Sequence, residues 1–118
     1  MAKPNLLGVA YARLARAVRD DWNASDDRDA AARLKSLATF ESRVLANPLR
    51  AGDPVARGKW PKDLARDYGE VPNLFRFELA QRWRGYFTMV GQPGGVMVHV
   101  LYLWDHEIYS DQSRYAKK

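Results

Sequence analysis

The amino-acid sequence predicts an α+β fold in which an N-terminal helical hairpin packs on a small, mostly antiparallel sheet. Apolar residues recur at helical spacing in residues 1–47, and they alternate along residues 71–109 with short turns between the alternating runs. A chain of 118 residues has room for one hydrophobic core. Residues 1–118 are therefore expected to form a single domain.

The predicted helical hairpin occupies the first part of the chain. Its first helix follows from an apolar stripe at four- and three-residue steps, made of Leu7, Tyr11, Leu14, Val18 and Trp22. Ser25 is the expected N-cap of the second helix, whose first turn is acidic, and Asn47-Pro48 is expected to end it. Two helices joined by so short a turn are expected to run antiparallel.

The predicted sheet follows a loop over residues 48–60 and a short helix that begins near Pro61 and stops at Gly69. Three strands are expected at residues 74–79, 83–91 and 96–103, with a tight turn at residues 92–95. The last strand is almost wholly apolar, which is typical of a central strand covered on both faces, and His99 is expected to be buried in it. The helices would cover one face of the sheet and leave the other for a ligand.

Composition favours an anionic partner and a cytoplasmic location. The net charge is +5 with a pI near 9.7, and arginine, whose planar fork suits phosphate, is more frequent than lysine. A GC-rich genome would give the same arginine bias. Cysteine is absent, no apolar run is long enough to cross a membrane, and the first residues lack a signal-peptide pattern.

Several kinds of chemistry have no support in the sequence. His99 and His106 are seven residues apart with no cysteine nearby, so metal-site spacing is missing. Gly94-Gly95 is not followed by the Lys-Ser/Thr pair of a phosphate-binding loop, and no serine lies in a nucleophile elbow. No metal and no cofactor are expected.

Arg76 and Arg84 are the first candidates for a functional site. They lie on neighbouring predicted strands with their side chains out of the sheet, and on a shared face they could bind a phosphate bidentately. The alternative is a structural cross-strand ion pair, for which Glu78 is the obvious partner.

His106 and the nearby tyrosines are the candidates for proton transfer. Histidine is the side chain best suited to move a proton near neutral pH, although His106 could instead simply cap the sheet. Tyr109 and Tyr115 could stack on a base or donate a proton, or they could pack the last segment against the domain.

A second basic cluster surrounds the predicted short helix, and it contains Arg57, Lys59, Lys62 and Arg66. Such clusters are often only solvated, but Trp60 within it would allow a base to stack. We expect Lys59, Trp60, Lys62, Arg82 and Tyr115 to contact RNA.

Residues 55–115 resemble the RelE/ParE superfamily of type II toxin–antitoxin toxins, and most closely its RelE-like, mRNA-cleaving members. The similar segments are KWPKDLARDYG (59–69), NLFRFEL (73–79), WRGYFTMVG (83–91) and LWDHEIYSDQSRY (103–115). The last is similar to the "DH-x-x-Y…Y" tail of many such sequences. The resemblance covers about half of the chain by motif and most of it by element order.

The resemblance implies a RelE-like fold and a ribosome-dependent endoribonuclease that cuts mRNA without a metal. In such enzymes the 2′-hydroxyl attacks the adjacent phosphate. By position, Arg84 matches the arginine that grips the scissile phosphate, and Arg76 matches a strand position that is usually basic. His106 matches the histidine of the tail, and Tyr109 or Tyr115 matches its tyrosine. The implied partners are mRNA, the ribosome and a cognate antitoxin, expected to be a small acidic protein; no membrane is implied.

Two features depart from the family pattern. Residues 1–10 give only a weak version of the strand with which the family opens, and Glu78 stands where a second basic residue is expected. Two other functions therefore stay open. The chain could be a catalytically inactive nucleic-acid- or protein-binding module of the same fold, or it could target a protein, as a gyrase poison of the ParE kind does.

Overall fold

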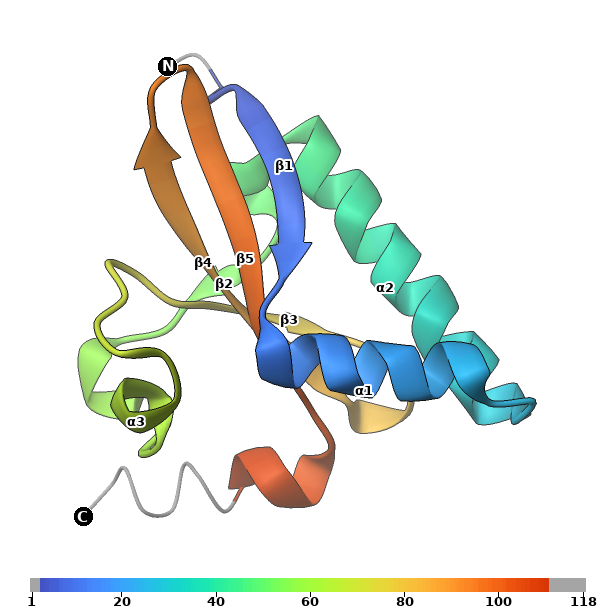
Figure 1. Ribbon diagram of the computed structural model, residues 1–118. Helices are drawn as coiled ribbons and strands as arrows, with labels where there is room; N and C mark the ends of the chain where they lie inside the picture. Colours follow the sequence, from blue (N-terminus) through green and yellow to red (C-terminus); the bar gives the residue numbers. More distant parts are fainter. Residues whose placement is uncertain (1–2, 111–118) are drawn as a thin grey trace.

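The structure is a computed structural model, and it describes residues 3–110 (Figure 1). The elements in chain order are β1 (Leu6–Tyr11), α1 (Arg13–Ala24), α2 (Arg28–Ala46), the 3-10 turn η1 (Pro48–Arg50), β2 (Asp53–Pro54), η2 (Arg57–Lys59), α3 (Leu64–Tyr68), β3 (Phe75–Glu78), η3 (Ala80–Arg82), β4 (Arg84–Gln92) and β5 (Gly95–Trp104). Residues 106–110 are again helical. None of the helices described is long and apolar enough to cross a membrane.

The five strands form one mixed sheet in the order β1-β5-β4-β3-β2. β1 runs parallel to β5, and every other neighbouring pair is antiparallel. The predictions of an α+β fold and of a mostly antiparallel sheet are confirmed. The turn between β4 and β5 is also where the sequence predicts it, with a positive φ at Gly94.

The predicted N-terminal position of the helical hairpin is wrong. Residues 6–11 form β1 instead of the first turn of a helix, because they pair with β5 from Leu6↔Val96 to Tyr11↔Val100. Leu7, which the helical stripe would bury, is 44% exposed. The helices α1 and α2 therefore lie between strands in the sequence.

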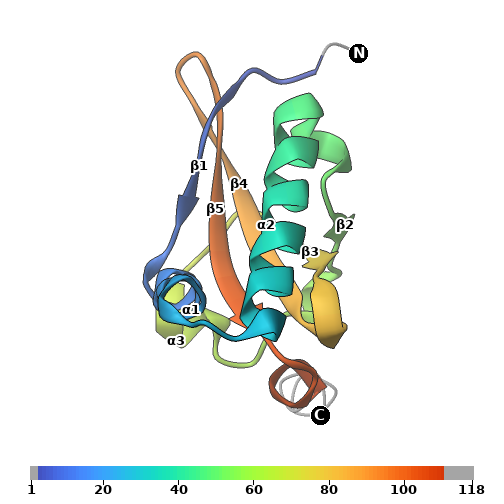
Figure 2. The same ribbon diagram turned by 90° about the vertical axis from the view of Figure 1, so that its right-hand side faces the viewer.

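The two long helices also do not lie side by side. Figure 2 shows α1 nearly end-on and α2 along its length, so they cross instead of running antiparallel. The cap of α2 differs from the prediction as well: Asp27, not Ser25, is the N-cap, and its Oδ1 accepts a hydrogen bond from the Asp29 amide at 3.0 Å. Asn47 ends α2 as expected.

The main hydrophobic core lies between α1, α2 and one face of the sheet. Phe87 at its centre has no exposed surface, and Phe40 of α2 stacks on Phe77 of β3 with 3.6 Å between ring centroids. Gly85 makes this stack possible, because any side chain at that position would overlap the ring of Phe77. The core thus fixes β3 and β4 against the helical layer at the end of β4 where Arg84 lies.

The other face of the sheet is only partly free. A smaller core covers its lower half in Figure 1, where Leu64 of α3 packs with Tyr86 and Tyr102. The α3 helix begins at Leu64, later than predicted, and ends at Gly69 with a φ of 72° as expected. The expectation that this whole face is left for a ligand is therefore wrong.

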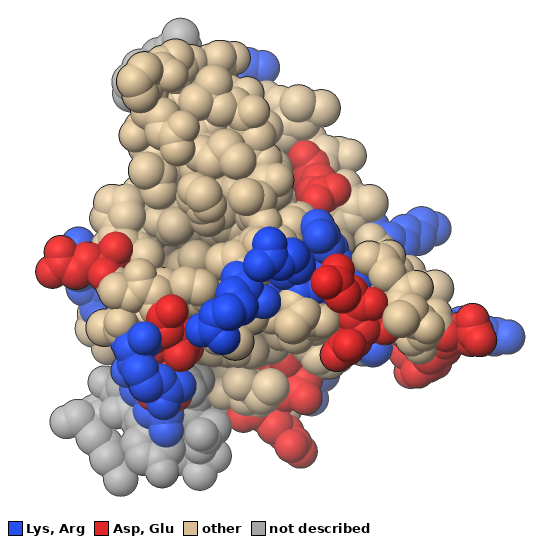
Figure 3. Space-filling model, viewed as in Figure 1, with Lys and Arg blue, Asp and Glu red and all other residues tan. Residues whose placement is uncertain are grey.

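The upper half of that face carries no helix of the described residues, and Figure 3 shows it tan, with charged side chains only at its edges. His99 lies on this part of β5 and is half-buried, so its predicted burial is wrong, because none of the described helices packs over β5 there. Below it, basic side chains form a band over the end of β1 and the start of α1 (Figure 3), and α1 carries Arg13, Arg16 and Arg19.

Candidate functional site

A small concave site of about 220 Å³ lies at the lower end of the sheet. Three cations line it: Arg76 from β3, Arg84 from β4 and Lys59 from η2. The floor includes the buried ring of Tyr86, and the remaining wall is the segment Pro54–Ala56. Antiparallel pairing explains the juxtaposition, because Arg76 is opposite Tyr86 and Arg84 is two residues before Tyr86, on the same face. Arg76 and Arg84 thus share one face of the sheet, which is the condition on which their candidate phosphate site depends.

Arg84 is held firmly within this site. Its side chain is only 18% exposed, and its Nε donates a hydrogen bond of 3.1 Å to Oε1 of Glu78, which is 61% exposed. Its guanidinium carbon lies 4.1 Å from the centre of the Tyr109 ring, a cation–π contact. The structural alternative for Arg84, an ion pair with Glu78, is therefore also present.

The charge state of Arg84 follows from these neighbours. Burial by itself lowers the pKa of Arg84, but hydrogen bonding to Tyr86 and the negative charge of Glu78 outweigh it, so the pKa is raised above its ordinary value. Arg84 is therefore a permanent cation that is partly shielded from water. Such a group binds an anion more strongly than an exposed arginine does.

His106 and Tyr109 extend the site on the other side of Arg84. His106 Nδ1 and the Tyr109 hydroxyl share a hydrogen bond of 3.0 Å, in which the hydroxyl donates when Nδ1 carries no proton. Nη2 of Arg82 lies 3.4 Å from each ring nitrogen of His106. A continuous set of contacts thus joins Arg82, His106, Tyr109 and Arg84.

An unusual backbone turn places Arg82 beside His106. Gln81 and Arg82 both have a positive φ, 57° and 63°, which is rare for residues other than glycine. The Trp83 amide closes the turn on the Ala80 carbonyl at 3.2 Å. Two successive left-handed residues form the hairpin turn that sequences usually build with Asn-Gly, so the backbone stores strain here.

Arg33 of α2 holds this turn in place. Its Nη1 donates a hydrogen bond of 2.7 Å to the side-chain oxygen of Gln81, and its guanidinium lies 5.1 Å from the Trp22 ring and 5.0 Å from the Trp83 ring. The Ala80 amide donates to Ser36 Oγ, also on α2, at 3.1 Å. The helical layer therefore supports the strained turn from behind.

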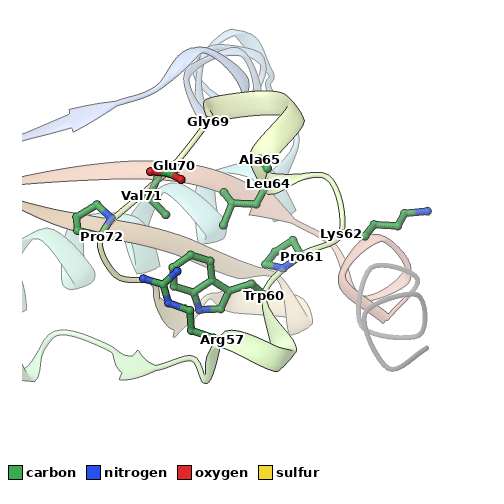
Figure 4. A pocket seen from close by; sticks show the side chains of 10 residues that line it. All are labelled: Arg57, Trp60, Pro61, Lys62, Leu64, Ala65, Gly69, Glu70, Val71 and Pro72. Carbon is green, nitrogen blue, oxygen red and sulfur yellow. The ribbon is translucent and has the colours of Figure 1, made fainter.

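The predicted RNA-contacting residues do not all meet in one place. Lys59 lines the concave site with Arg76 and Arg84, whereas Trp60 and Lys62 line a separate, larger cavity (Figure 4). Arg82 lies at the His106 end, and Tyr115 lies outside the described residues. Tyr86 also lines the concave site, on the strand face that it shares with Arg84, although it is not among the predicted site residues.

The arrangement brings together groups for two chemical tasks. Arg76, Arg84 and Lys59 can bind a phosphate and neutralise charge that develops on it. His106 and Tyr109 can accept and donate protons within reach of Arg84. No known family model matches this chain, and no curated protein sequence matches it either.

Proposed function

We propose that this protein is a RelE-like toxin of a type II toxin–antitoxin pair and cleaves mRNA on the ribosome. The carrying observation is the partly buried Arg84, which lines the concave site together with Arg76 and Lys59 and contacts Tyr109 of the Tyr109–His106 pair. The scissile phosphate would lie against the three cations. Its partners would be mRNA, the ribosome and an acidic antitoxin in the cytoplasm.

The proposed reaction is attack of a ribose 2′-hydroxyl on the adjacent phosphate. A base removes the 2′-proton, the new P–O bond forms, and the 5′-oxygen leaves with a proton from an acid, which gives a 2′,3′-cyclic phosphate and a 5′-hydroxyl. His106 and Tyr109 are the proposed base and acid. Arg84 and Arg76 would stabilise the extra negative charge of the pentacovalent phosphorane.

The order of elements supports the RelE-like part of the proposal. The resemblance implies an opening strand, and β1 is present where the sequence alone gave only a weak signal. Two helices follow, and the remaining strands form an antiparallel run that carries Arg76 and Arg84.

The proposal is tested by mapping cuts in mRNA on programmed ribosomes. The wild-type protein is expected to cut within the A-site codon and to leave a 2′,3′-cyclic phosphate. The matched control is the same mRNA with a single 2′-deoxy nucleotide at the cut position, which should not be cut because it lacks the attacking hydroxyl. Cutting of the deoxy substrate at the same bond would rule out this mechanism, and no cutting by folded protein would rule out the activity.

A second function is favoured by one contact. Glu78 already pairs with Arg84, the cation that would have to stabilise the phosphate during cleavage. The protein could therefore bind RNA without cutting it. An acidic side chain beside the phosphate would also repel it.

Replacing Glu78 with glutamine is expected to strengthen RNA binding under either function. Because the Glu78 side chain is 61% exposed, its ion pair with Arg84 contributes at most about 1 kcal/mol, so loss of the pair should raise affinity by no more than about fivefold. The slope of log affinity against log salt should steepen by up to about 0.7 as Arg84 gains a phosphate. Glu107→Gln, which makes the same charge change at an exposed position, is the control. Equal effects of the two variants would mean that Glu78 does not compete with the phosphate.

A further inference from the structure

A cavity of about 560 Å³ lies beside the candidate site and has no role in the proposed cleavage. Figure 4 shows Trp60 and Pro61 on one side of it and Leu64 and Val71 on the other. Its volume falls within the range of small-molecule sites. Because apolar groups face each other across it, it suits a flat ligand that is apolar on both faces.

Charged groups at the rim narrow the chemistry of the ligand. The guanidinium carbon of Arg57 lies 4.5 Å from the Trp60 ring centre, so a planar cation already stacks on this wall. Lys62 also lines the cavity, but Figure 4 shows its side chain pointing away from Arg57 and Trp60, whereas Glu70 contributes a carboxylate on the wall opposite Trp60. The guanidinium of Arg57 suits a phosphate, and the carboxylate of Glu70 suits a group that offers two neighbouring N–H donors.

Guanine is the nucleobase that presents such donors, at N1 and N2, while adenine presents an acceptor at N1. We propose that this cavity binds a guanine nucleotide, with the base between Trp60 and Val71, its N–H edge on Glu70 and its phosphate at Arg57. The choice of a nucleotide rests on the proposed function. A guanine close to the cleaved bond would then belong to the sequence that the protein recognises.

The position of the cavity fits this role. The segment Pro54–Lys62 borders both hollows, since Ala56 and Lys59 face the concave site while Arg57 and Trp60 face the larger cavity. The indole of Trp60 is fixed in orientation by its Nε1 hydrogen bond to the Val55 carbonyl at 2.8 Å. An RNA strand that crosses this segment could thus place its phosphate and a base in adjacent sites.

The proposal is tested by titrating ¹⁵N-labelled full-length protein with GMP and with AMP and following the backbone amide signals. GMP is expected to shift amides of residues 57–72, and to bind at least about fivefold more tightly than AMP, as a bidentate base contact implies. Mononucleotides contain no phosphodiester to cut. The titration therefore tests the guanine site independently of the cleavage assay. Either the guanine site or the proposed cleavage can be refuted without the other.

Two variants and one control make the result specific. Glu70→Gln should abolish the preference for GMP, and Ala65→Trp, at an exposed position lining the cavity, should abolish the shifts by filling it. Asp20→Asn, at an exposed position on α1, should change neither the preference for GMP nor the amide shifts. The proposal is overturned if GMP shifts no amide of residues 57–72, if AMP binds equally well, or if Glu70→Gln keeps the preference.

Discussion

Replacing Arg84 with alanine is expected to reduce mRNA cleavage by about 100- to 1000-fold while the protein stays folded. Loss of one preorganised donor to a developing oxyanion has an effect of this size. Arg84 is the cation best placed for such a role, because it is 18% exposed and contacts both Glu78 and Tyr109. The measurement is the rate of A-site cleavage on programmed ribosomes, with growth inhibition on induced expression as a second readout.

The controls for Arg84→Ala separate charge, geometry and folding. Arg84→Lys keeps the charge but loses the planar fork, so it should recover only part of the rate. Arg50→Ala removes an exposed arginine from η1, outside the candidate site, and should cleave as the wild type does. A folded Arg84→Ala protein that still inhibits growth fully would remove Arg84 from the mechanism.

The strands of the sheet could be predicted where the pattern that indicates them lies within a few neighbouring residues. Alternation over residues 74–79 and 83–91 and the turn at residues 92–95 are patterns within a few neighbouring residues, and β3, β4 and β5 formed close to those positions. The same alternation put Arg76 and Arg84 on one face. These parts of the fold depend on period and turn chemistry, which a single sequence displays.

The first strand could not be predicted because its partner is distant in the chain. Leu7, Tyr11 and Leu14 match helical spacing, and nothing near them indicates pairing with β5, about ninety residues later. Parallel pairing overrode the local pattern. The helical hairpin was then placed too early in the fold.

The extent of the candidate site was hidden for a different reason. Gln81 and Arg82 are not residues that indicate a left-handed turn, so the contact of Arg82 with His106 had no sequence signal. Likewise η2 turns Lys59 toward the concave site and leaves Trp60 facing the neighbouring cavity, which separates two residues adjacent in the sequence.

Replacing Phe87 with alanine is expected to lower the free energy of unfolding by about 3–5 kcal/mol, as for other fully buried phenylalanines. The ring has no exposed surface and stacks on Phe75 at 5.2 Å between centroids, with Phe40 and Phe77 at 5.3 and 5.9 Å. Small domains have only about 5–15 kcal/mol in total, so this loss is a large fraction. Urea unfolding should show a lower midpoint with an unchanged slope.

The matched control for Phe87→Ala is Leu45→Ala, because Leu45 is 75% exposed on α2. That variant should stay within about 0.5 kcal/mol of the wild type, since it leaves no cavity. Phe87→Leu should fall between the two, because it removes part of the ring volume and keeps the apolar contact. Phe87 packs on β3 and against Gly52, just before β2, as well as on α2, so its loss should loosen the strand that carries Arg76. An unfolding free energy for Phe87→Ala within about 1 kcal/mol of the wild type would contradict a core built around this ring.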